Sequence, residues 1–152
     1  MAWQTQPGPP GPLHWSARYV LMARYVVGGR TFPDLDCWGL VADVHRTELG
    51  IELPTYALTA ESDQAEVRAA IAGATCSPYW EPADPAKQPR EFAVAWYRIM
   101  GHEHVAIFVD PRHVLFLTRT GASIRHYGTP ALGNHMQGIY YARSPIGHGS
   151  PR

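Results

Sequence analysis

A cysteine at the start of an expected helix and a histidine at the start of an expected strand could do chemistry together. Cys37 lies in residues 36–41 (DCWGLV), after a turn-rich segment, and His104 opens the apolar run 104–109. Thiolate is the attacking form of cysteine, and an imidazole can take the thiol proton and later pass it to a leaving amine. The two residues therefore predict nucleophilic catalysis, provided that the fold brings helix and strand together.

The residues before Cys37 predict a reactive setting for its thiol. Asp36 can cap the helix because its carboxylate accepts from unpaired backbone N–H groups. Those N–H groups favour the anion, so we expect them to lower the pKa of the thiol, and they can stabilise an oxyanion on a bound carbonyl. Tyr25 precedes the turn at Gly28 and Gly29, which could fold its hydroxyl back over the thiol as a further donor.

The chain predicts helices first and a strand meander after them. We expect helices over residues 13–25, 37–49 and 63–72. The first rests on the spacing of Ala17, Val20 and Leu21. The second has a buried stripe of Cys37, Leu40, Val41, Val44 and Leu49, and stops at Gly50. Strands are expected over residues 92–99, 104–109, 114–118, 124–127 and 137–143. We predict an α+β domain whose N-terminal helices pack on a five-stranded antiparallel sheet.

The composition favours a single domain with a real core. Of the 152 residues, 45% are hydrophobic, with five Trp and eight Tyr, and only 17% are charged. We expect the domain over residues 13–143, an extended Pro- and Gly-rich lead-in over 1–12 and a tail over 144–152. Residues 74–90, which are rich in proline and lack periodicity, are expected to form a long ordered loop.

Several classes of function find no support in the sequence. A net charge of zero gives no argument from bulk charge for binding nucleic acid or an anionic membrane. No apolar stretch reaches the roughly 18 residues of a membrane span, and the first residues lack the basic-then-apolar pattern of a signal peptide. Cys37 and Cys76 are too few for a disulfide framework, so two free thiols are expected.

Other polar and aromatic residues have simpler interpretations. His102 and His104 would share a strand face, as metal ligands often do, but a third ligand is not evident, and we expect neither a metal nor a cofactor. Glu103 is expected to face solvent. Trp38 either lines a pocket or packs on the sheet. Core or loop anchors, rather than a ligand platform, are expected for Tyr79, Trp80 and Trp96.

The sequence resembles the NlpC/P60 family of cell-wall peptidases. The family pattern is Pro-Tyr-x-x-Gly-Gly, a short loop, Asp-Cys-x-Gly-Leu-Val and a Gly-x-x-His-Val-(Gly/Ala)-Ile strand. The matching residues are Tyr25, Gly28, Gly29, Asp36, Cys37, Gly39, Leu40, Val41, His104, Val105, Ala106 and Ile107. Trp38 replaces the Ser common in bacterial members. With residues 14–20, 49–54 and 138–141, the motif around Trp38 resembles the branch found as phage tail assembly or tail tip proteins.

The resemblance implies a papain-like fold and hydrolysis of peptide bonds in peptidoglycan stem peptides. By the same resemblance, Cys37 would be the nucleophile, His104 the base and Tyr25 an oxyanion donor. In the family a third polar residue on the next strand orients the histidine. The ungapped count here falls on Phe116, which cannot hydrogen-bond the ring. His113 could serve if the turn differs in length, and the other candidates are Thr118 and His126.

The phage-like features imply a peptidase at the virion tail tip, with other tail tip proteins as partners. Such a protein would be assembled in the host cytoplasm and would act at the host cell wall or periplasm during genome entry. Phe116 favours an alternative, a structural tail-tip or tail assembly subunit that keeps the peptidase fold without turnover. An acyltransferase is a third alternative, because nucleophiles other than water can resolve a thioester.

Overall fold

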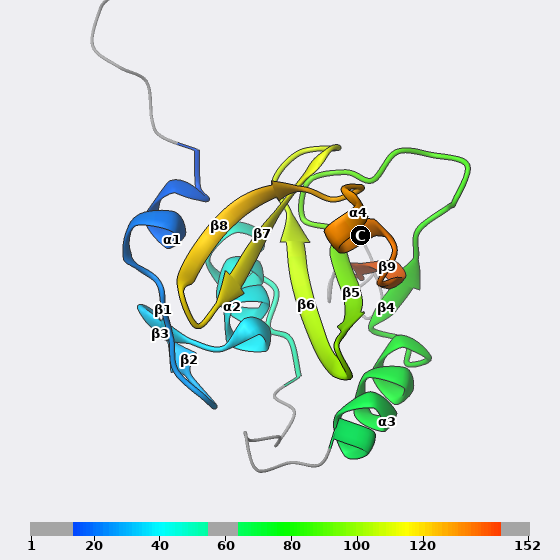
Figure 1. Ribbon diagram of the computed structural model, residues 1–152, viewed down its shortest axis with the longest axis horizontal. Coiled ribbons are helices and arrows are strands. Elements are labelled where there is room, and N and C mark those ends of the chain that lie inside the picture. Colours follow the sequence, from blue (N-terminus) through cyan, green and yellow to red (C-terminus); the bar gives the residue numbers. More distant parts are fainter. Residues whose placement is uncertain (1–13, 55–63, 144–152) are drawn as a thin grey trace, which may run out of the picture.

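The computed structural model describes residues 14–54 and 64–143, which form two sheets and several short helices (Figure 1). The helices are α1 (Ala17–Met22), α2 (Cys37–Val44), the π-helical turn η2 (His45–Leu49), α3 (Gln64–Thr75) and α4 (Pro130–Gly133). The expected lead-in over residues 1–12 and tail over 144–152 lie outside the described residues. Within the described part, no helix has the length and apolar character needed to cross a membrane.

The larger sheet is antiparallel, in the order β4-β9-β5-β6-β7-β8. Its strands are β4 (Trp80–Pro82), β5 (Val94–Ile99), β6 (His102–Phe108), β7 (His113–Thr118), β8 (Gly121–His126) and β9 (Met136–Ala142). The α+β class and the five expected strands are confirmed, with small shifts at their ends. The count of five strands is wrong, because β4 forms inside the expected loop and pairs with β9.

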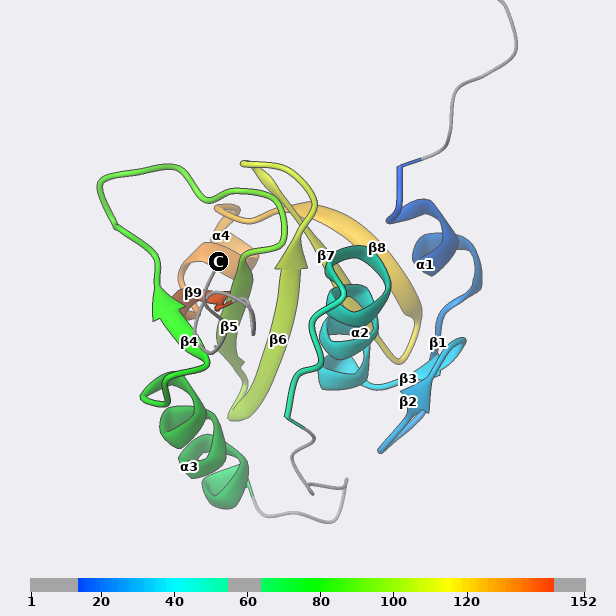
Figure 2. The same ribbon diagram turned by 180° about the vertical axis from the view of Figure 1, so that it is seen from behind.

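Helix α2 is held against one face of this sheet. Figure 2 shows α2 in front of β7, with β6 running between α2 and α3. Leu40, Val41 and Val44 are fully buried in one cluster with Ile107 and Leu115 of the sheet. The opposite face carries a second cluster that includes Tyr97, Phe108, Phe116 and Leu132. Burial on both faces thus fixes β6 and β7 between two packed clusters.

The ends of α2 follow the signals in the sequence. The Asp36 side chain caps the helix by accepting from the backbone N–H of Gly39 at 2.7 Å. Gly50 ends the following turn with φ +67°, the left-handed conformation that glycine adopts without a steric penalty. The expected helix over 37–49 is therefore present, with its last turn widened into η2. Leu49, expected in the buried stripe, is 40% exposed.

Candidate active site

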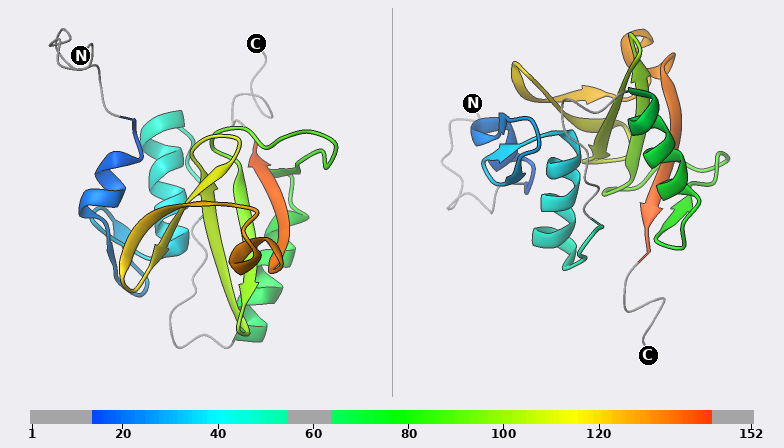
Figure 3. Two further views of the ribbon diagram at one scale, coloured as in Figure 1. Left: turned by 45° about the horizontal axis from the view of Figure 1, so that its top comes forward. Right: turned by 90° about the horizontal axis from the view of Figure 1, so that it is seen from below.

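A small sheet brings Tyr25 next to Cys37. Its strands are β1 (Arg24–Tyr25), β2 (Arg30–Thr31) and β3 (Asp34–Leu35), with β3 in the middle. Tyr25 pairs with Leu35 in parallel, and Arg30 pairs with the same residue in antiparallel fashion. Because β3 runs directly into the N-cap of α2, the small sheet lies beside the start of the Cys37 helix (Figure 3). Most of this segment was expected to be a loop.

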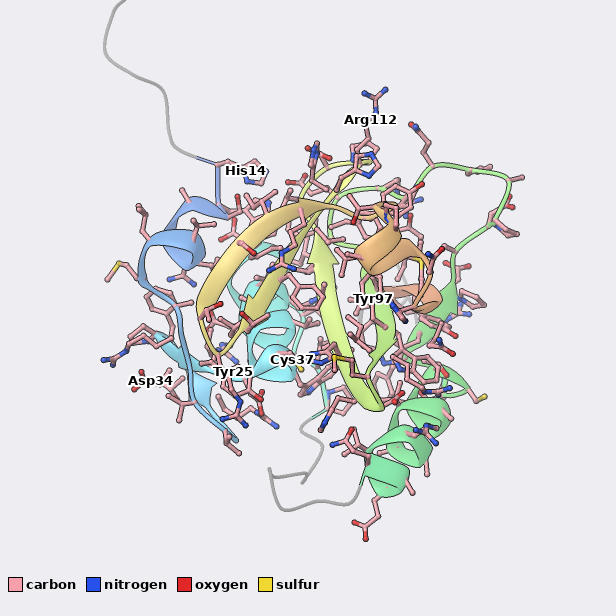
Figure 4. All side chains as sticks on the ribbon, in the orientation of Figure 1. His14, Tyr25, Asp34, Cys37, Tyr97 and Arg112 are labelled. Carbon is pink, nitrogen blue, oxygen red and sulfur yellow. The ribbon has the colours of Figure 1, made fainter. Side chains whose placement is uncertain are left out.

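The three residues proposed for catalysis line one cavity of about 180 Å³, called here the Cys37 cavity. Figure 4 shows Tyr25 and Cys37 close to the start of α2. Across the cavity lie apolar residues of α3, namely Val67, Ala70, Ile71 and Ala74. Trp38, Trp80 and Trp96 also line it. Tyr25, Cys37 and His104 thus border the same cavity. Among the described residues, no group of three or more His, Cys, Asp and Glu could hold a metal ion.

The Cys37 thiol has a raised pKa, contrary to the expectation from its place at a helix start. Burial is the largest cause, and the Asp36 charge acts in the same direction. The backbone N–H groups of Val105 and Trp38 and the charge of Arg30 lower the pKa, but they do not outweigh burial. The helix-start amide is therefore present as expected. Because the sulfur is withdrawn from water, the pKa of the Cys37 thiol is raised instead of lowered.

Val105 faces the thiol because β6 and β7 separate at this point. The two strands pair only at Ile107 with Leu115 and at Phe108 with Val114. Before Ile107 the ladder to β7 stops, and the Val105 N–H is a hydrogen-bond donor to the Cys37 sulfur. Two backbone amides, of Trp38 and Val105, thus favour the thiolate form of Cys37.

We expect Cys37 to be alkylated by iodoacetamide more slowly than Cys76 at neutral pH. A raised pKa leaves less of the reactive thiolate at a given pH, so the Cys37 rate should climb as the pH rises into the alkaline range. Cys76 is exposed and serves as the reference within the same protein. Mass spectrometry of the two cysteine peptides gives both rates. A Cys37 rate that equals or exceeds the Cys76 rate at neutral pH would contradict the direction of this shift.

His104 is half-buried, with its ring stacked on Phe116. Burial lowers the pKa of the ring, the His102 charge adds to this, and Glu103 opposes it. The imidazole is therefore neutral at neutral pH and able to accept a proton. Within residues 14–54 and 64–143, its ring nitrogens have no hydrogen-bond partner.

The candidates for a third polar residue lie elsewhere in the fold. His113 lies beside Val109, roughly 16 Å along β6 from His104 at the usual rise per residue. Its Nδ1 is 2.9 Å from Asp110 Oδ1 in the turn, and His126 pairs with it on β8. The Thr118 hydroxyl is 2.9 Å from the Thr120 hydroxyl. The pairing of β6 with β7 therefore does not bring His113 next to His104.

Glu103, expected to face solvent, is buried beside the Cys37 cavity. Its side chain is 0% exposed. It accepts from Trp96 Nε1 at 2.8 Å and Arg98 Nε at 2.9 Å, and lies 3.6 Å from Arg68 of α3. Its backbone N–H donates to Gln64 of the same helix at 3.1 Å. The hairpin register offered a sequence signal, because Arg98 and Glu103 are cross-strand partners.

Replacing Glu103 with alanine is expected to lower the free energy of unfolding by about 2 kcal/mol. Removing one partner of a buried ion pair commonly costs more, but Arg68 and Arg98 are partly exposed and can be hydrated. Urea denaturation checks the value, with Glu81→Ala as the control because Glu81 is exposed on β4. Equal stabilities for the two variants would mean that the Glu103 network does not hold α3 to the sheet.

Comparison with known proteins agrees with this geometry. The model of the NlpC/P60 family matches residues 22–140, from the end of α1 into β9. The match includes Tyr25, Cys37 and His104, and it suggests a cysteine peptidase that hydrolyses peptidoglycan. No curated protein matches the sequence significantly.

Proposed function

Because the chain belongs to the NlpC/P60 family, we propose that it is a cysteine peptidase that hydrolyses peptidoglycan stem peptides. The observation that carries the proposal is the single cavity lined by Cys37, His104 and Tyr25. Cys37 is the nucleophile, His104 the general base and Tyr25 a donor to the oxyanion. These assignments rest on the chemistry of the three groups and on the family motif that they occupy.

In this mechanism the thiol becomes charged only as it reacts. The neutral His104 ring accepts the thiol proton while the Cys37 sulfur attacks the amide carbonyl. The resulting oxyanion accepts from backbone N–H groups and from the Tyr25 hydroxyl. Burial, followed by the charges of Cys37 and Asp36, raises the pKa of Tyr25, so its hydroxyl stays protonated as a donor. Collapse expels the amine, which takes the proton from His104, and water then hydrolyses the thioester.

We further propose that this peptidase belongs to a phage tail tip. Support comes from the Asp-Cys-Trp-Gly-Leu-Val motif and the flanking segments that resemble the phage branch of the family. On this proposal the protein is assembled into the virion in the host cytoplasm, contacts other tail tip proteins, and acts at the host cell wall or periplasm during genome entry.

Digestion of purified peptidoglycan and defined stem peptides tests the peptidase. The protein should be used as Cys76→Ala, so that iodoacetamide at alkaline pH blocks Cys37 alone. Untreated protein is expected to release new amino groups, and blocked protein is expected to release none. Digestion that survives complete alkylation of Cys37 would overturn the assignment. Absence of digestion by folded, untreated protein would overturn the peptidase proposal for the isolated chain.

A structural tail subunit is the second candidate function, favoured by the absence of an acceptor for the His104 ring among the described residues. Loss of an orienting group can lower the rate of a catalytic triad by several orders of magnitude. Phage that carry Cys37→Ala distinguish the two functions. Complete tails that fail to infect through an intact cell wall favour the peptidase. Normal infection by these phage favours the structural subunit.

A further inference from the structure

We propose that Phe116 is a positioning residue, which fixes the orientation of the His104 ring by stacking on its face. The two ring centroids are 5.7 Å apart, and the ring planes are inclined by 30°. A stacked ring restricts rotation of the imidazole, which is one of the tasks of an orienting hydrogen bond. This inference rests on the proposed function of Cys37 and His104 and extends it to a residue with no polar group.

The β-sheet register explains why Phe116 reaches His104. Phe116 follows Leu115, the β7 partner of Ile107, just where the two strands separate, and its side chain packs in the same cluster as Tyr97 and Ala106. On the other side, β5 places Tyr97 directly opposite His104. The imidazole therefore stands between neighbours contributed by two strands.

Phe116 is itself held firmly enough to act as a platform. Its side chain is 3% exposed, and its ring lies 5.9 Å from the ring of Tyr97, which is fully buried. The Arg125 guanidinium from β8 lies over the Phe116 ring, 5.5 Å from its centroid. Packing thus fixes the phenyl ring on the sheet face, so rotation of the His104 ring would separate two stacked rings.

Two substitutions at position 116 distinguish a positioning role of Phe116 from simple filling of the core. Leucine preserves apolar character and fills much of the space but offers no flat face. Histidine preserves an aromatic ring and adds nitrogens that can hydrogen-bond His104, although a polar group is unfavourable in a core. Positioning predicts that histidine is the better replacement for turnover. Core filling predicts that leucine is the better one.

The experiment compares wild type with Phe116→Leu and Phe116→His in hydrolysis of stem peptides. We expect Phe116→Leu to lower kcat roughly 10- to 100-fold with little change in KM, as a misplaced catalytic group does. Phe116→His should keep at least the wild-type kcat. The concentration of folded protein is set by circular dichroism and by urea denaturation, so that loss of folded protein is not counted as loss of rate. A wild-type kcat in Phe116→Leu would overturn the proposal.

A second measurement reads the position of His104 without any substrate. Nuclear Overhauser contacts between the His104 ring and the Cys37 methylene are expected in wild type and in Phe116→His, and are expected to disappear in Phe116→Leu. If wild type shows these contacts but no hydrolysis, the proposed function fails while the positioning role stands. Contacts that persist unchanged in Phe116→Leu would overturn the positioning role, whether or not the protein is an enzyme.

Discussion

Replacing Cys37 with alanine is expected to abolish hydrolysis of stem peptides, lowering kcat/KM by a factor of roughly 10³ or more. The variant loses the sulfur atom that forms the thioester. His104 then has no thiol to deprotonate, and no oxyanion forms for the donors to stabilise. Release of amino groups from defined peptides measures the rate.

The fold should survive the Cys37→Ala change. The cap of α2 comes from the Asp36 side chain, so removing the Cys37 sulfur leaves the helix start intact. Cys76→Ala is the matched control, because Cys76 is exposed and lies outside the Cys37 cavity. It should keep the full rate. Residual hydrolysis by Cys37→Ala at more than about a thousandth of the wild-type rate would mean that another group attacks the peptide.

The parts of the site that could be predicted from sequence are those that local residues determine. Asp36 and Gly50 fix the ends of the Cys37 helix through their own backbone and side-chain preferences, which act whatever the rest of the chain does. The strand that carries His104 was recognisable from a continuous apolar run, because β6 is buried on both faces. Cavity lining by Tyr25, Cys37 and His104 followed from the family motif rather than from periodicity.

The features that sequence reasoning missed depend on contacts between distant segments. Strand β4 has only three residues, and its pairing partner β9 lies far along the chain, so no local alternation marks it. In α1 the spacing indicated Val20 and Leu21, yet Leu21 is 76% exposed and Tyr19 is fully buried. Tyr19 faces the core because its hydroxyl donates a hydrogen bond to the buried Asp43 carboxylate at 2.6 Å.

The pKa of the Cys37 thiol also depends on contacts between distant segments, and its direction was therefore not predictable from the sequence around Cys37. The amide at the helix start was predictable, whereas the extent of burial was not, because it is created by β6 and by the small sheet rather than by α2. Desolvation opposes the charged thiolate, and here it outweighs the amides. The consequence for mechanism is a thiol that depends on His104 for activation during attack, which explains why the orientation of that ring matters so much.

Replacing Gly39 with alanine is expected to lower the free energy of unfolding by about 3 kcal/mol, although alanine favours helices. A Cβ atom at this position would collide with the carbonyl oxygen of Gly29. That carbonyl cannot easily move aside, because it accepts from the Asp36 N–H at 3.2 Å and from Arg30 Nη1 at 2.9 Å. The collision would push the start of α2 away from the small sheet, so hydrolysis should fall with stability.

Gly73→Ala provides the matched control for this prediction. Gly73 also lies within a helix, α3, but a Cβ there would meet nothing within 4 Å. Only the higher helix propensity of alanine then affects stability, and the variant should be more stable than wild type by up to about 1 kcal/mol. Urea denaturation of the two variants therefore separates propensity from close approach. Stabilisation by both substitutions would mean that the backbone of residues 28–30 moves aside at little energetic cost to accommodate the Cβ atom at position 39. The cap, Tyr25 and Cys37 would then not form the rigid unit on which the proposed chemistry depends.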